Sequence, residues 1–247
     1  MSSGVEYSSA GGPLVKEMKL NLFVSKQPDD ESCGITCLEA IYNYYGQETS
    51  LEQLKGEIEH WQTGGTVSVN LARHALSSGY SAEIYTYNIK IFDPTWMNLS
   101  QKDLEHKLKH RQRKIRSKKQ KKVIGFYLDF LRKGGILRFD DLSEDLLDRL
   151  FADRKPIIVG LSATYLYQNI RETSNNEDND IIGNPVGHFV VVSGWDPKER
   201  TVMINDPLRK NPISDTGTYQ LPFVRFSNAV MLGILTYDEN LLVIAKK

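Results

Sequence analysis

Two residues near the start of the chain have the types and spacing of a thiol nucleophile and its oxyanion donor. Cys33 begins a predicted helix and is followed by Gly34, so the free backbone N–H groups and the helix dipole favour its thiolate form. Gln27 precedes Cys33 by six positions, across the polar turn 28–32. A turn of that length can fold the Gln27 amide over the helix N-terminus, where it and the Cys33 backbone N–H can stabilise an oxyanion.

His188 and Asp206 can supply the base and the orienting group that a Cys nucleophile needs. His188 opens the most apolar strand pattern of the chain (FVVV), directly after Gly187. The next strand ends 18 residues later at Asp206, and a hairpin turn at Asp196-Pro197 would bring that end beside His188. By itself this pair is equally compatible with a strand-opening His near a turn-forming Asp-Pro. The other histidines are most simply solvated side chains: His60, His74, His106 and His110.

Taken together, these four residues and their surroundings resemble the papain-like cysteine peptidases of the C39 (bacteriocin-processing) type. The matching motifs follow the family's order: Gln27, ESCGITCLEAIYNYYG, the Gly64-Gly65-Thr66 turn, LSSGYSAEIY, Lys155-Pro156-Ile157-Ile158 and GHFVVVSGWD…VMINDP. They cover roughly residues 20–87 and 155–210. The resemblance implies that Cys33 is the nucleophile, His188 the general base, Asp206 the orienting acid and Gln27 the oxyanion donor.

Three features depart from the family's pattern. Ser32 stands where the family very often has Asp, and the region 88–150 has no counterpart in the resemblance. No membrane or ATPase domain follows, so export-coupled leader cleavage is not implied. Cys37, one helical turn after Cys33, is expected to pack in the core, because an i, i+4 pair in a helix is poorly placed for an unstrained disulfide.

Helical patterns come first along the chain and strand patterns second, which predicts the α+β class. With the resemblance, the predicted architecture is a papain-like fold in which a helical layer packs on an antiparallel sheet containing 157–161, 188–193 and 201–205. Residues 1–18 are expected to form a flexible leader, and residues 19–247 one domain with a basic, mainly helical insertion at about 88–142. Further elements are expected as helices at 33–45, 51–58, 68–78 and 143–151 and as strands at 19–25, 80–87 and 241–245.

The charge of the chain is unevenly distributed. Its 247 residues carry 31 Lys+Arg and 31 Asp+Glu, yet residues 106–122 alone hold ten Lys/Arg, two His and no acid. We expect this run to be exposed, either as a solvated helix face or as a site for an anionic partner such as nucleic acid, an acidic protein or anionic lipid. It lacks interleaved aromatic residues, so base stacking has no support.

Composition excludes several classes of protein. No stretch without a formal charge is longer than that from Pro156 to Ile170, which has 15 residues; a membrane span needs about 18 or more apolar residues. No Lys or Arg precedes Lys16 and the N-terminus has no apolar h-region, so a secretory signal is not expected. Two cysteines exclude a disulfide scaffold and a multi-thiolate zinc site, and no metal or other cofactor is predicted. We therefore expect a cytoplasmic protein.

The predicted function is thiol-dependent hydrolysis of a peptide or isopeptide bond in a peptide or protein substrate. One alternative is acyl or peptide transfer, because an amine or thiol can attack a thioester on Cys33 as water does. Proteins resembling phytochelatin synthase use a similar Cys-His-Asp set in this way. The other alternative is a non-catalytic papain-fold module that binds an anionic partner through residues 106–122. The sequence leaves the substrate and the oligomeric state open.

Overall fold

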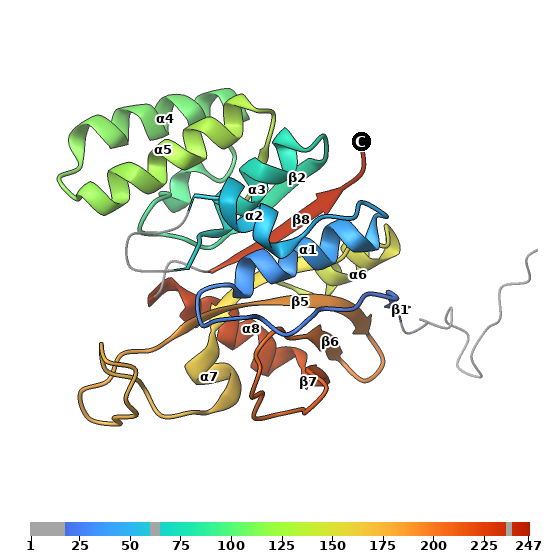
Figure 1. The fold of residues 1–247 in the computed structure, drawn as a ribbon. Coiled ribbons are helices and arrows are strands. Elements are labelled where there is room, and N and C mark those ends of the chain that lie inside the picture. The colour runs from blue at the N-terminus through green and yellow to red at the C-terminus, as the bar shows by residue number, and fades with distance from the viewer. Residues whose placement is uncertain (1–17, 60–64, 236–238) are drawn as a thin grey trace, which may run out of the picture.

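One mixed sheet organises the fold (Figure 1), and its strands run in the order β3-β2-β8-β4-β5-β6-β7, with β1 paired to β5. The structure, a computed structural model, describes residues 18–59, 65–235 and 239–247. The predicted leader up to residue 17, together with His60 and Gly64, lies outside these ranges. The strands are β1 (Met18–Lys19), β2 (Ser81–Thr86), β3 (Ile136–Arg138), β4 (Ile157–Ser162), β5 (Gly187–Asp196), β6 (Thr201–Asn205), β7 (Thr218–Pro222) and β8 (Asn240–Ala245).

Helices lie between the strands along the described chain, which begins with β1 and ends with β8. They are α1 (Cys33–Tyr44), α2 (Leu51–Glu57), α3 (Ser68–Ser77), η1 (Pro94–Trp96), α4 (Gln101–Lys114), α5 (Lys118–Arg132), α6 (Glu144–Ala152), α7 (Ala163–Tyr167), α8 (Phe223–Leu232) and η2 (Gly233–Leu235). The neighbouring strands of the sheet are antiparallel except for the parallel pair β2–β3. The predicted α+β class is therefore confirmed.

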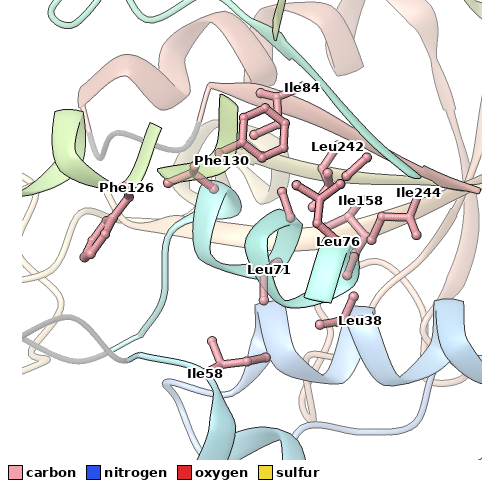
Figure 2. Packing of buried hydrophobic residues seen from close by; sticks show 14 of the residues in the cluster. Leu38, Ile58, Leu71, Leu76, Ile84, Phe126, Phe130, Ile158, Leu242 and Ile244 are labelled. Atoms are coloured by element: carbon pink, nitrogen blue, oxygen red, sulfur yellow. The ribbon is translucent and has the colours of Figure 1, made fainter. Parts of the chain in front are cut away.

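Helices cover both faces of the sheet. Side chains alternate along a strand, so Ile158 and Leu242 join the core with α1, α3 and α5, whereas Ile157 and Val243 join the core with α6 and α8. Figure 2 shows the first of these cores; its labelled members include Leu38, Leu71, Leu76, Phe126, Phe130, Ile158, Leu242 and Ile244. The prediction of one helical layer is incomplete, because α6 to α8 form a second one.

Local signals fix most helix ends. Gly46 follows α1 with φ +80°, a conformation that suits glycine, and the Ser50 side chain accepts a hydrogen bond from the Gln53 N–H at the start of α2. Ser68 is the first residue of α3, after the N-cap Val67. The strand predicted for residues 19–25 is wrong: only Met18–Lys19 pairs with β5.

The basic run folds as a helical hairpin rather than as one long helix. Ser100 caps α4, Ile115 ends it in an extended conformation, and Ser117 caps α5. Leu104 and Leu108 of α4 are buried with the apolar side of α5, while most cations of the run face outward. The two helices pack together beside α3 (Figure 1).

Strands β4, β5 and β6 lie side by side, as predicted. Leu161 of β4 faces His188 of β5, and β5 forms an antiparallel hairpin with β6 that pairs Asp196 with Thr201. This register returns the chain after Asn205 to the region where β5 starts. The hairpin therefore brings Asp206 next to His188, although 18 residues separate them.

Candidate active site

Cys33 lies at the N-terminus of α1 and is partly exposed. Its N-cap, Ser32, makes no side-chain cap hydrogen bond, and the Ser32 carbonyl accepts from the Thr36 N–H at 2.9 Å. Gly34 follows because α1 packs closely here: a Cβ at that position would lie 2.8 Å from Thr66 Cγ2 and 3.1 Å from Phe189 Cδ2. Cys33 thus places a thiol at the start of the helix, and Gly34 lets the helix backbone lie close to Thr66 and Phe189.

His188 brings an imidazole from β5 to this thiol. Its side chain is 6% exposed, its Nε2 lies 2.9 Å from Asp206 Oδ1, and it lines the same cleft as Cys33. Burial lowers the pKa of His188, but the interactions with Asp206 and Cys33 outweigh burial and raise that pKa to about 10. Because Asp206 occupies Nε2, the ring nitrogen left for the thiol is Nδ1.

Asp206 follows β6 and accepts hydrogen bonds at both carboxylate oxygens. Oδ1 accepts from His188 Nε2 and from the Leu208 N–H, each at 2.9 Å, and Oδ2 accepts from the hydroxyls of Tyr167 at 2.7 Å and Tyr219 at 2.6 Å. Burial raises the pKa of Asp206, but the His188 hydrogen bond and charge, with the Tyr219 hydroxyl, lower it to about 2. The carboxylate is therefore charged and fixed in orientation.

Gln27 is tied to the segment that follows Asp206. Its N–H donates to the Pro207 carbonyl at 2.8 Å, and its carbonyl accepts from Arg209 Nε at 2.8 Å. The side-chain Nε2 donates to the Asp29 carbonyl at 2.8 Å, which leaves one amide hydrogen. Its Oε1 is buried and has no hydrogen-bond partner among the described residues.

The turn between Gln27 and Cys33 is held by Asp29, which the sequence analysis did not single out. Its Oδ1 accepts from Ser32 Oγ at 2.5 Å and from the Glu31 N–H at 3.0 Å, and its Oδ2 pairs with Lys55 Nζ at 2.5 Å. The Lys55 hydrogen bond, followed by that of Ser32, lowers the pKa of Asp29 to about 2. Ser32, a departure from the family's pattern, thus serves here as a donor to a charged carboxylate.

These residues face a cleft of about 620 Å³ whose lining includes Gln27, Cys33 and His188. One wall comes from the start of α5, with Lys119 and Val123, and another from α7 and the segment after it. Acidic side chains also line the cleft: Asp30, Glu31 and Glu172. The arrangement gives a substrate access to the thiol while Asp206 stays buried behind His188.

Cys37 has a different environment from Cys33. It is fully buried in the core between α1 and the sheet, and its Sγ donates to the Phe189 carbonyl at 3.5 Å. Burial raises the pKa of the Cys37 thiol, and the nearby Cys33 and Asp206 raise it further. The predicted core role of Cys37 agrees with this position.

Tyr167 and Tyr219 are two further site residues that sequence reasoning missed. Tyr167 ends the short helix α7, and Tyr219 lies on β7, two elements that were not predicted. No spacing relates them to Asp206 in the sequence, since they meet it only through the packing of α7 and β7 around the end of β6. The only local signal was the polar-aromatic character of each residue.

Neither a metal cluster nor a membrane-spanning helix is seen in the described ranges. There, no group of three or more His, Cys, Asp or Glu side chains is arranged to hold a metal ion. None of the helices in the described part of the chain is long and apolar enough to cross a membrane.

Residues 22–113 match the model of the Peptidase C39 family. This match confirms the predicted resemblance to C39 peptidases. It also agrees with the predicted class of enzyme, a peptidase-type hydrolase. The matched segment contains Gln27 and Cys33 and ends before His188 and Asp206. Among curated proteins, none matches the chain.

Solved structures with a similar arrangement include several peptidases. A C39-like peptidase from Bacillus anthracis is 15% identical, with 94% of this chain and 98% of that chain covered and a TM-score of 0.48. The peptidase domain of Streptococcus ComA is 13% identical, with 93% and 99% covered and a TM-score of 0.45. A double glycine motif protease from an AMS/PCAT transporter, solved with its leader peptide, is 16% identical, with 93% and 94% covered and a TM-score of 0.45.

Proposed function

We propose that the protein is a cysteine peptidase in which Cys33 is the nucleophile, His188 the general acid and base, and Asp206 the group that orients His188. The observation that carries this proposal is the meeting of three elements: a thiol at the start of α1, an imidazole at the start of β5 that lines the same cleft, and a buried carboxylate 2.9 Å from that imidazole. The C39 match over residues 22–113 supports it independently.

The proposed reaction begins when the Cys33 thiolate attacks the carbonyl carbon of a peptide or isopeptide bond in the cleft. The C–N bond then breaks, the amine leaves with the proton of the His188 imidazolium, and a thioester remains on Cys33. A water molecule then attacks the thioester carbonyl, and His188 takes a proton from that water. The C–S bond breaks, the carboxylic acid leaves, and the thiolate and imidazolium are restored.

In this mechanism, Gln27 stabilises the oxygen of the tetrahedral intermediate. Its Nε2 has one hydrogen that is not used by the Asp29 carbonyl, and the first N–H groups of α1 are directed at the same region. The backbone bonds to Pro207 and Arg209 keep the amide in place beside the His188–Asp206 pair. The proposed oxyanion donors are thus the Gln27 side-chain amide and the first backbone N–H groups of α1.

The test is cleavage of a randomised peptide library, read by mass spectrometry, with the wild type and with Cys33→Ala. We expect new termini with the wild type and none with Cys33→Ala. Adding hydroxylamine as an acceptor separates hydrolysis from transfer: a peptidase yields free carboxylates when no acceptor is present. Products that form only with an acceptor would favour acyl transfer, and identical results for both proteins would contradict an enzyme.

A second function is favoured by the outward face of the α4–α5 hairpin. Several of its cations are exposed, and we refer to six of them that lie close in sequence as the basic surface: Lys107, Arg113, Lys114, Arg116, Lys118 and Lys121. Since the start of the same α5 lines the cleft, a partner on this surface would lie near Cys33. We propose that the basic surface binds an acidic segment of a protein substrate.

Binding of poly-L-glutamate, followed by fluorescence anisotropy at two salt concentrations, tests this second proposal. The double variant Lys118→Glu/Lys121→Glu, in which two cations are replaced by acids, should bind poly-L-glutamate about ten-fold more weakly. The same change at Lys198→Glu/Lys210→Glu, away from the hairpin, should leave it intact. Equal losses of affinity in the two double variants would show that binding depends on net charge and not on the basic surface. The predicted cytoplasmic location and the division into leader, domain and insertion remain predictions.

A further inference from the structure

Two tyrosine hydroxyls donate hydrogen bonds to Oδ2 of the Asp206 carboxylate, which we call its outer oxygen. The two tyrosines come from elements on different sides of the carboxylate. Tyr167 reaches Oδ2 at 2.7 Å from the end of α7, and Tyr219 reaches the same atom at 2.6 Å from β7. The inner oxygen Oδ1 is left for His188 and the Leu208 N–H. All four donors converge on a carboxylate that is 1% exposed.

The elements that present the two hydroxyls are themselves anchored. The Ser162 side chain caps α7, and Arg225 of α8 donates to the Leu166 carbonyl at 2.5 Å. On the other side, Ile204 pairs with Tyr219 in the β6–β7 ladder, and the Asp206 N–H donates to the Gly217 carbonyl at 2.8 Å. The hydroxyl positions are thus set by backbone structure rather than by flexible side chains alone.

Both hydroxyls can act only as donors to the carboxylate. Burial, and then the negative charge of Asp206, raise the pKa of Tyr167 and that of Tyr219, so both keep their protons. The Tyr167 ring also contacts the His188 ring, with centroids 6.2 Å apart, and lines the cleft. A phenylalanine at either position would keep the ring packing and remove only the hydrogen bond.

We propose that Tyr167 and Tyr219 are positioning residues that clamp Asp206, so that its inner oxygen faces His188 Nε2 throughout the reaction. This inference rests on the proposed function, because the carboxylate matters to chemistry only if His188 does. Without the clamp, Oδ2 is buried with no donor, and the carboxylate turns to recover hydrogen bonds. His188 then loses the fixed partner that selects its tautomer and ring plane.

The test uses Tyr167→Phe, Tyr219→Phe and their double, with Tyr165→Phe as the matched control. Tyr165 lies on the same helix α7, is exposed, and its hydroxyl accepts from Asn228 instead of contacting Asp206. The first readout is the ¹³C NMR titration of the Asp206 carboxyl, assigned with Asp206→Asn. Each hydroxyl that stabilises the charged form should, when removed, raise the titration midpoint by about 0.5–1 pH unit.

The second readout is hydrolysis of p-nitrophenyl acetate, an activated ester that a thiol can open without peptide recognition. We expect kcat to fall by about 10- to 100-fold in the double variant with KM nearly unchanged, and no change in Tyr165→Phe. A midpoint or a kcat that does not move in the double variant would overturn the clamp. If the wild type shows no Cys33-dependent hydrolysis, the proposed function fails, while the NMR titration still reports whether the hydroxyls hold Asp206.

Discussion

The His188–Asp206 site and the α4–α5 hairpin handle charge in opposite ways. At the site, a carboxylate and an imidazole are almost completely buried, and every carboxylate oxygen has two donors. In the hairpin, most cations point to solvent, and ion pairs there lie at the surface, such as Lys109 with Glu105 and Lys122 with Glu59. The free-energy cost of an unpartnered charge is large in the first environment and small in the second.

This difference indicates which residues tolerate substitution. A buried charge must keep its partners, so the site depends on contacts between α1, α7, β5, β6 and β7 that are far apart in sequence. The hairpin depends on an apolar stripe, with Leu104, Leu108 and Ile124 buried, and its cations are not needed for that packing. Substitutions in the two regions should therefore differ in both size and kind of effect.

The largest expected effect is on activity at Cys33. Cys33→Ala removes the nucleophile and should abolish hydrolysis, and His188→Ala should nearly do so, since the thiol then has no base. Both proteins should still unfold cooperatively, as followed by circular dichroism. Cys37→Ala is the internal control, because it removes a buried thiol at a cost of about 1 kcal/mol of packing but should retain activity. Loss of activity in Cys37→Ala with intact folding would contradict the assignment of Cys33.

A smaller loss is expected from Gln27→Ala. Removing one oxyanion donor typically lowers kcat by about 10²–10³-fold, and the α1 N–H groups remain. The backbone bonds of residue 27 to Pro207 and Arg209 do not need the side chain, so the loop should persist. Steady-state kinetics should show the loss in kcat. A change confined to KM would instead make Gln27 a substrate-binding residue.

Asp206→Asn should reduce both activity and stability. The pKa of Asp206 is depressed from 3.8 to about 2, so its contribution is present above pH 3.8 and is lost as the pH falls through 2. The pKa of His188 is raised from 6.5 to about 10, so its contribution is complete below pH 6.5 and is lost as the pH rises through 10. The pair is therefore strongest between about pH 4 and 6.5.

Urea unfolding at several pH values measures this contribution. At pH 5.5, Asp206→Asn should lower the free energy of unfolding by about 3–5 kcal/mol, because it leaves a buried imidazolium without its partner. The deficit should shrink as the pH is raised from 6.5 toward 10. A deficit that stays constant over this range would mean that the His188–Asp206 pair is not charged in the folded protein.

The smallest effect is expected in the hairpin. Lys118→Glu and Lys121→Glu should each change the free energy of unfolding by no more than about 0.5 kcal/mol, as is usual for exposed positions. Hydrolysis of p-nitrophenyl acetate should not change, because neither side chain lines the cleft. A large loss of stability in either variant would break the contrast between the two regions.

Much of the fold follows from local sequence patterns, and so does the His188–Asp206 pair. Ser50, Ser100 and the glycine after α1 mark helix ends through short-range hydrogen bonds and φ preferences. The apolar strands around His188 predict the β5–β6 hairpin, and its register then places Asp206. These inferences need no more than the contacts between neighbouring elements.

The rest depends on contacts that no local pattern encodes. Tyr167 and Tyr219 meet Asp206 only because α7 and β7 pack against the end of β6, and neither element has a strong periodic signal. The break at Ile115 that turns the basic run into a hairpin is set by the burial of Leu104 and Leu108 against α5. Asp29 is a turn residue whose role depends on Lys55 from another helix.

The most direct test of the account is the alkylation of the two cysteines by iodoacetamide at pH 6, mapped by peptide mass spectrometry. Cys33 should be carbamidomethylated quickly, because it is partly exposed at the start of α1 and shares the cleft with His188, and Cys37 should not react while the protein is folded, because it is buried. In His188→Ala, the rate at Cys33 should fall to that of an ordinary thiol. Equal rates at Cys33 in the wild type and His188→Ala would contradict the proposed active site.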